Sequence, residues 1–404
     1  MNLTIAIVGL AGLILVHELG HFLTALAVGM RPRRFALGIG PLVAKTTRNG
    51  VEYGIGAIPL GGYVKIPGMH RPIGRDADGH FARALREAPE LVSPIERLKR
   101  RLDAGETDEA RRELEELRKA IAEASLGPEA IKAAARGVQE LDDSLGREAY
   151  WRQPIWKRVV VIFAGPATNA VFAIALFAAL FMLGGGKATR TVDQVLPGRP
   201  AATAGLQAGD RIVAIDGVSV RPGEIPLRIQ RSGGRPVRLT VERGGRRIAL
   251  DPVRPRKDQG AFRLGFRLRG ESLSAPEAGW ESIQLTGIVT REIALALTRL
   301  VHKQGRKEIS STVGIVQVSS QTLDEGAKAY LWVLGLISLS LALFNLLPLL
   351  PLDGGHITFS LIEGVRRRAV GREVYERVSA VGIALVLLLF FVGLSNDIGR
   401  IGGD

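Results

Sequence analysis

The pentapeptide His17-Glu18-Leu19-Gly20-His21 lies in the second half of an apolar run that extends from about residue 3 to residue 28. Helical positions four apart face the same side, so both imidazoles can reach one metal ion and the glutamate can reach a water bound to it. A charged group in the middle of a membrane span is unfavourable by roughly 2.5–3.5 kcal/mol. Polar residues on an apolar helix therefore predict a metal site rather than polar packing without metal.

Three further apolar segments are long enough to cross a bilayer of about 30 Å. The predicted spans are residues 3–28, 158–184, 330–350 and 378–395. The first has neither the basic start nor the cleavage site of a signal peptide, so we expect a retained helix. The net charge is +14, and basic clusters such as Trp156-Lys157-Arg158 and Arg366-Arg367-Arg368 flank the apolar runs. This pattern indicates a lipid bilayer, and no nucleic-acid-binding signature accompanies it.

The basic loops also predict the topology. The positive-inside rule puts the loop after the first span and the loop between the third and fourth spans in the cytoplasm. Both termini and the segment 185–329 then lie outside. The expected location is the bacterial inner membrane.

The metal site needs a third protein ligand, because catalytic zinc sites usually combine three such ligands with one water. The protein has no cysteine, so this ligand is a histidine or a carboxylate. Asp353 follows the third apolar segment, where Pro348 and Pro351 break the helix and the topology gives it the depth of the two histidines. We assign it as the third ligand of a single Zn²⁺, which lowers the pKa of bound water to about 7, and we assign Glu18 as the base.

The remaining histidines are weaker candidates. His356 is equally compatible with a role behind the metal ligands and with an ordinary place at the membrane interface. The other three are solitary and are predicted to be surface residues: His70, His80 and His302.

Two segments between the first and second spans differ in character. Residues 35–68 alternate short apolar stretches with glycine, which predicts a β-hairpin or small sheet at the membrane interface. Residues 82–150 are rich in Ala, Glu, Arg and Leu, with one expected helix start at Ser93 and a second at Thr107. We predict a helical cytoplasmic insertion, which is either a solvated spacer or a partner-binding module.

Residues 190–255 alternate strands with turns, and the stretch from Ala204 to Gly217 resembles the core signature of a bacterial PDZ domain. Such a domain binds an extended peptide or the C-terminus of another protein as an added strand. The alternative is an unrelated small β domain. Amphipathic helices are expected over 275–329, with a β-like stretch at Thr312–Val318.

Taken together, the motifs resemble those of the site-2 proteases, the bacterial RseP-type intramembrane zinc metalloproteases of peptidase family M50. The resemblance covers everything except about 82–150. It implies that His17, His21 and Asp353 hold zinc and that Glu18 is the catalytic base. It also implies substrate contacts for Asn345, for Asn169 of the GPxxN element, and for the β-segment residues Gly61, Gly62 and Tyr63. The sequence departs from the family pattern at Leu350, where a proline is usual, and has one PDZ domain.

The predicted fold is an α-helical polytopic membrane protein with about four transmembrane helices, a membrane-associated β-segment, a small α+β PDZ domain and a helical insertion. The predicted boundaries are 1–30, 31–80 (β-segment), 81–150 (insertion), 151–186, 187–258 (PDZ), 259–329 (linker helices), 330–357, 358–377 (basic loop) and 378–404.

The expected activity is hydrolysis within the transmembrane segments of single-pass proteins, such as pre-trimmed anti-sigma factors or signal-peptide remnants. Two alternatives are an inactive PDZ scaffold in the membrane and a zinc transporter or sensor. A scaffold need hold no zinc, and a transporter would have no need for Glu18.

Overall fold

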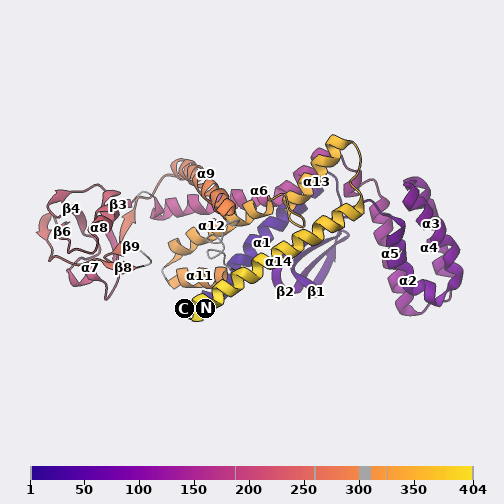
Figure 1. Ribbon diagram of the computed structural model, residues 1–404, viewed down its shortest axis with the longest axis horizontal. Helices are drawn as coiled ribbons and strands as arrows, with labels where there is room; N and C mark the ends of the chain where they lie inside the picture. The colour runs from indigo at the N-terminus through magenta and orange to yellow at the C-terminus, as the bar shows by residue number, and fades with distance from the viewer. Residues whose placement is uncertain (1, 187, 259–260, 300–310, 325, 403–404) are drawn as a thin grey trace. The chain divides into compact units, whose positions relative to one another are not determined.

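The computed structural model describes residues 2–186, 188–258, 261–299, 311–324 and 326–402. In these ranges four helices are long and apolar enough to cross a membrane (Figure 1). They are α1 (Asn2–Ala27), α6 (Ile155–Leu180) with a π-helical turn (Phe181–Gly185), α12 (Ala327–Asn345) and α14 (Arg372–Gly402). The four predicted spans are thus found as helices. The protein forms two compact units. The first contains Met1–Phe172, Thr290–Gln321 and Ile337–Asp404, and the second contains Ala173–Val289 and Thr322–Leu336.

In the first unit, α1 and α6 pack closely through small residues. A Cβ built on Gly20 would lie 2.5 Å from the carbonyl oxygen of Ala164 and 2.5 Å from Thr168 Oγ1. The same hydroxyl donates to the carbonyl of Val16 at 3.1 Å. Small residues of this kind let membrane helices approach each other, and here they bring α6 against the helix that carries the histidines.

The β-segment consists of two long strands, β1 (Arg34–Arg48) and β2 (Val51–Lys65), joined by a tight turn at Asn49 and Gly50. Residues 34–37 pair with residues 62–65 and also lie beside residues 52–55, so the hairpin curls into a small sheet. Positive φ values at Gly38 and Gly61 permit the bends. The predicted hairpin or small sheet is confirmed.

The third span ends earlier than predicted, at Asn345 rather than at residue 350. A non-helical stretch with both prolines follows, and α13 (Asp353–Arg366) begins at Asp353. The predicted break before Asp353 is confirmed. The prediction of a basic loop over 358–377 was wrong for most of its length, because α13 and α14 leave only residues 367–371 outside helices.

The insertion is a bundle of four helices, α2 (Gly74–Glu87), α3 (Val92–Ala104), α4 (Thr107–Glu123) and α5 (Pro128–Leu145), with a 3₁₀ turn at Pro89–Leu91. It has its own apolar core, in which Phe81, Leu98 and Leu117 are fully buried. The predicted helix start at Thr107 is confirmed. The predicted start at Ser93 was wrong, because the 3₁₀ turn leads directly into α3 at Val92.

The second unit contains a sheet domain, residues 188–270, with strand order β10-β3-β4-β6-β7 and β5 beside β4. The helices α7 and α8 complete one apolar core with these strands. The predicted end at residue 258 was too early, because β10 pairs with β3. The elements are β3 (Ala188–Val195), α7 (Pro200–Thr203), β4 (Arg211–Ile215), β5 (Val218–Ser219), α8 (Glu224–Arg231), β6 (Leu239–Arg243), β7 (Arg246–Ala249), β8 (Arg256–Asp258), β9 (Ala261–Arg263) and β10 (Phe266–Gly270).

Two helices, α9 (Ala275–Arg299) and α11 (Thr312–Asp324), follow the sheet domain in the sequence. The expected β-like stretch at Thr312–Val318 was therefore wrong. The buried carboxylate of Asp397 accepts hydrogen bonds from the N–H groups of Ser311 and Gly314, which stabilises a helix start there. His302 lies outside the described residues.

Candidate metal centre

Three predicted ligands converge at one point of the first unit. Asp353 Oδ2 lies 3.1 Å from His17 Nε2 and 3.4 Å from His21 Nε2, and the two histidine nitrogens are 3.3 Å apart. The histidines come from successive turns of α1, and Asp353 comes from the first turn of α13. Each of the three residues can therefore place one atom against the same ion.

The spacing of these atoms fits a tetrahedral metal ion. Zinc–nitrogen bonds of about 2.0–2.1 Å give a tetrahedron with edges of roughly 3.3–3.4 Å. In addition, Asp353 Oδ2 is buried and makes no hydrogen bond within the described part of the protein. A buried carboxylate oxygen without a partner is unfavourable, and a cation between the three side chains would remove this penalty.

His21 is oriented by the backbone of α6. Its Nδ1 lies 2.9 Å from the carbonyl oxygen of Val161, which accepts a hydrogen bond and leaves the Nε2 lone pair for a metal. Gly165 makes this approach possible, because a Cβ at that position would overlap the imidazole. The sequence contains the Gly165-Pro166 pair but carries no signal for the role of Val161.

His17 is oriented by Asn169, which is fully buried on α6. The Asn169 amide lies 3.4 Å from His17 Nδ1, and its Oδ1 has no hydrogen-bond partner among the described residues. With the amide turned so that Oδ1 faces Nδ1, the imidazole donates to it and both atoms are satisfied. His17 Nε2 is then free to bind a metal. This position gives Asn169 an orienting role toward His17, and its predicted substrate contact stays a prediction.

Glu18 is buried beside the metal ligands, and the β-segment reaches it. A Cβ built on Gly62 would lie 2.8 Å from Glu18 Cγ, so only a glycine permits this contact. Of the other predicted substrate-binding residues, Gly61 forms a bend of β2, and Tyr63 accepts a hydrogen bond from Arg34 at 3.0 Å. Asn345 is the half-buried last residue of α12.

The other described histidines are His70, His80 and His356, and the surface positions predicted for the first two are only partly confirmed. His356 hydrogen-bonds with the Tyr375 hydroxyl, and among the described residues no hydrogen bond or ion pair joins its side chain to one of the three ligands. His70 was predicted at the surface but is half-buried, with its ring centroid 4.2 Å from that of Tyr375. His80 is half-buried beside Glu140.

An ion pair between α6 and α13, largely shielded from solvent, could not be predicted from the sequence. Arg158 Nη1 lies 2.7 Å from Glu363 Oε2, and the Arg158 guanidinium also lies over the Tyr150 ring, 5.0 Å from its centroid. Arg158 was interpreted as one of the basic residues that flank a span. Nothing in the sequence distinguishes it from its neighbour Lys157, because its partner is far away in the sequence.

Two histidines and an aspartate that converge among apolar helices, with a glutamate beside them, define the class of membrane metalloproteases. The protein belongs to peptidase family M50, whose family model matches residues 5–389. It is an integral membrane protein and a metalloprotease.

Curated relatives agree with this assignment over at least 94% of their own lengths. LL2128 of Lactococcus lactis is named as a zinc metalloprotease. It is 28% identical over 96% of this protein and 96% of its own length. R01501 of Rhizobium meliloti, also named for zinc metalloprotease activity, is 30% identical over 97% of this protein and 94% of its own length. Metalloprotease MmpA of Caulobacter vibrioides is 27% identical over 97% and 94%.

Proposed function

We propose that this protein hydrolyses peptide bonds within the transmembrane segments of single-pass membrane proteins, using one zinc ion held by His17, His21 and Asp353. The observation that carries the proposal is the convergence of these three side chains at tetrahedral spacing. Two of them, His17 and His21, lie on a helix that is long and apolar enough to span a bilayer. Zinc supplies a Lewis acid and lowers the pKa of a bound water.

The residues of the protein have separate roles in this reaction. Glu18 takes a proton from the attacking water and delivers it to the leaving amine. Val161 and Asn169 hold the two imidazoles with Nε2 toward the ion. Burial of the ligands keeps bulk water from competing for them.

The substrate must unwind before its backbone can be attacked, because a transmembrane helix already uses its amides in hydrogen bonds. We infer that the edge of the β-segment, from Gly61 to Tyr63, pairs with the unwound strand and replaces those bonds. The contact of Gly62 with Glu18 supports this arrangement. Asn345 is proposed to contact the substrate backbone or the developing oxyanion.

The sheet domain is proposed to act as a PDZ domain that admits substrates by a peptide or a new C-terminus. In support, Gly205, Gly209 and the Asp216-Gly217 turn all have positive φ around β4, as tight turns in the predicted core signature require. The proposed location is the bacterial inner membrane, with both termini and the sheet domain outside and the insertion in the cytoplasm. Pre-trimmed anti-sigma factors and signal-peptide remnants are the proposed substrates.

The test uses the purified protein in detergent with a panel of tagged single-span proteins. Wild-type protein should contain close to one zinc per molecule and cut at least one of them, with loss of cleavage after chelation. Glu18→Gln should abolish cleavage and leave zinc content unchanged. The matched variant Asp353→Asn should lose both.

The alternatives predict different results. Wild-type protein without zinc would support an inactive scaffold and refute the proposal. Full cleavage by Glu18→Gln would remove Glu18 from the reaction. Zinc uptake into sealed vesicles without cleavage of any reporter would favour a transporter.

A further inference from the structure

The helical insertion, defined as residues 74–148, is docked on the β-segment by ion pairs. Arg33 makes a two-pronged pair with Asp143 of α5, and Lys65 Nζ lies 2.6 Å from Glu140 Oε1. A guanidinium that contacts both carboxylate oxygens fixes orientation as well as distance. The first turn of α14 adds a third link, because Arg372 contacts both carboxylate oxygens of Asp76. These contacts attach the insertion to the rest of the first unit through side chains as well as through its two chain ends.

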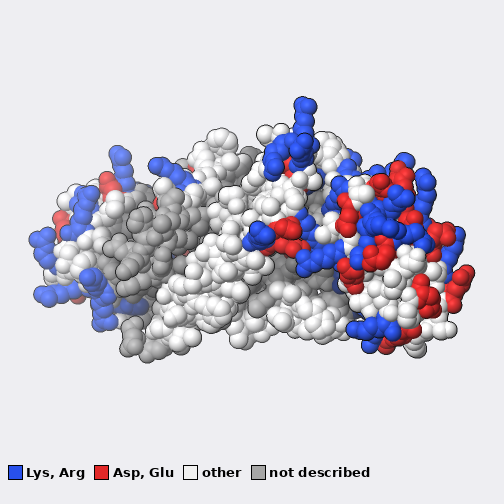
Figure 2. Space-filling view, turned by 45° about the vertical axis from the view of Figure 1, so that its right-hand side comes forward, with Lys and Arg blue, Asp and Glu red and all other residues white. Residues whose placement is uncertain are grey.

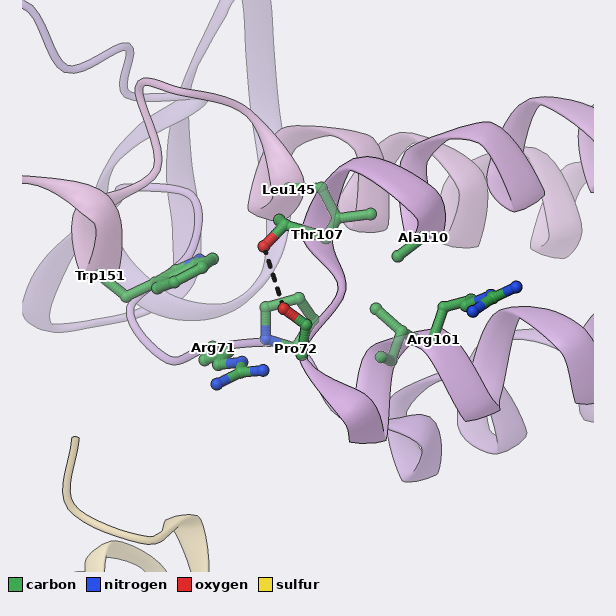
Figure 3. Close-up of a pocket in the computed structure, with 9 residues that line it drawn as sticks. Arg71, Pro72, Arg101, Thr107, Ala110, Leu145 and Trp151 are labelled. Carbon is green, nitrogen blue, oxygen red and sulfur yellow. Dashed lines mark hydrogen bonds between the residues drawn. The ribbon is translucent and has the colours of Figure 1, made fainter. Parts of the chain in front are cut away.

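The two chain segments that flank the insertion are also hydrogen-bonded to each other. The N–H groups of Tyr150 and Trp151 donate to the carbonyls of Pro67 and Gly68 at 3.0 and 2.9 Å. Figure 3 shows Arg71, Pro72 and Trp151 at this root, beside Thr107 at the start of α4. The space between them is about 10 Å³, which holds at most a single water, so the root is packed and offers no ligand site.

Between the docked insertion and the β-segment lies a groove of about 770 Å³. One wall is formed by residues 63–67 at the end of β2, and the opposite wall by Arg136, Gln139 and Glu140 of α5. A volume of this size is within the range of natural binding pockets. Figure 2 shows that charged side chains crowd the helices of the insertion, while much of the neighbouring surface is uncharged.

The strand wall of the groove leads directly to the candidate metal centre. Gly62–Lys65, here named the strand edge, pairs with residues 34–37, and within the described ranges the register gives it no partner on its other side. Its first residue contacts Glu18. A peptide paired with this edge advances about 3.3 Å per residue. A substrate strand with its reacting bond beside Glu18 would therefore enter the groove within a few residues.

The charges of the groove favour an acidic occupant. The four carboxylates in its wall are each matched by a cation in the same wall, in the pairs Glu52–Arg34, Asp76–Arg372, Glu140–Lys65 and Asp143–Arg33. Arg136 has no such match among the described residues, where its side chain donates to the carbonyl of Lys132 in its own helix. One exposed positive charge in the lining of the groove thus has no acid beside it among the described residues.

We propose that this groove holds, in extended form, the segment of the substrate that leaves the membrane next to the cleaved bond, with an acidic side chain opposite Arg136. The inference rests on the proposed function. The strand edge provides main-chain hydrogen bonds that tolerate many sequences, and Arg136 provides a preference among them.

Kinetics test the preference. The probe is a single-span reporter cut by the wild-type protein, made with Asp or with Lys at each position two to six residues beyond the cut on the side of the insertion. Arg136→Gln should raise the KM of the best Asp reporter by about fivefold with kcat unchanged, and should not raise the KM of the Lys reporter. The matched control is Arg112→Gln, an exposed arginine of α4 outside the groove, which should change neither.

Cross-linking tests the position, since the natural protein has no cysteine. In the Glu18→Gln background, a cysteine at Gln139 should form a disulfide with cysteines of the reporter two to six residues past the cut, and a cysteine at Arg112 should not. A cleaved reporter with no cross-link at Gln139 and no effect of Arg136→Gln would overturn the groove and leave the proposed function intact. An equal rise in KM for Asp and Lys reporters would indicate a bound lipid headgroup and would also overturn it. A reporter panel that the wild-type protein never cuts would refute the proposed function itself.

Discussion

His17 and His21 differ in what holds the second nitrogen of each ring. A backbone carbonyl holds His21, and no substitution can delete it, whereas a side chain, Asn169, holds His17. We expect Asn169→Leu to lower zinc affinity by about 10- to 100-fold, because His17 loses the partner that fixes its orientation and tautomer. Zinc retention during a chelator titration measures this directly.

Asn169→Asp is the informative companion variant, because it keeps an acceptor oxygen toward His17 Nδ1. It should retain zinc at least as well as the wild-type protein. If both variants bind zinc normally and only lose substrate affinity, Asn169 would be a substrate contact after all.

Asp210 links β4 to β6 in the sheet domain. Burial raises the pKa of Asp210, but hydrogen bonds from Arg243 and from the Gln207 N–H outweigh this effect, so the pKa lies below its usual range. A depressed folded-state pKa stabilises the domain above the unfolded value of about 3.9, and this stabilisation is lost as the pH falls through the folded value.

We therefore expect amide protection in β4 to fall as the pH drops below about 4, the unfolded-state pKa of an aspartate, in hydrogen-exchange experiments on the full-length protein. Asp210→Asn should lower the free energy of unfolding of the domain by about 2 kcal/mol at neutral pH and flatten this pH dependence. An Asn variant with an unchanged acid transition would show that other groups dominate it.

At the scale of elements, the contact between α1 and α6 depends on glycine. Gly165→Ala places a methyl group where the His21 imidazole lies, so the ring must move or the helices must separate. We expect zinc affinity to fall at least about tenfold. Gly12→Ala is the control, because a Cβ there meets nothing within 4 Å. Equal zinc affinity in both variants would contradict this geometry.

The elements differ in how far the sequence predicts them. Long apolar runs predict the four spans, and the HELGH spacing predicts that the two histidines share a helix face. Both predictions need only the local sequence, namely its apolar composition and the helical period. The stretch at Thr312–Val318 misleads, because its β-branched residues suit a strand while the carboxylate that favours a helix start there, on Asp397, is distant in sequence. The orienting roles of Val161 and Asn169 likewise depend on helix register between distant segments.

At the scale of the whole molecule, the docking of the insertion depends on charge rather than on a shared apolar core. We expect Arg33→Glu to loosen it, because the carboxylate of Asp143 would then face another acid. Hydrogen exchange in residues 62–68 should rise severalfold. The double variant with Asp143→Arg should restore protection, and failure of this rescue together with unchanged exchange in the single variant would show that the pair does not hold the insertion.

The pair of hydrogen bonds that joins Pro67 and Gly68 to Tyr150 and Trp151 has a consequence for protein engineering. The chain enters and leaves the insertion at neighbouring points. The two hydrogen bonds there offset part of the entropy cost of closing the long loop between residues 68 and 150. We expect another compact domain with adjacent termini, such as a fluorescent reporter, to be accepted at these two points, although the hairpin would lose its ion pairs with Asp143 and Glu140. The enzyme would then carry the reporter at the position of the insertion, while the helices that hold the metal ligands stay in place.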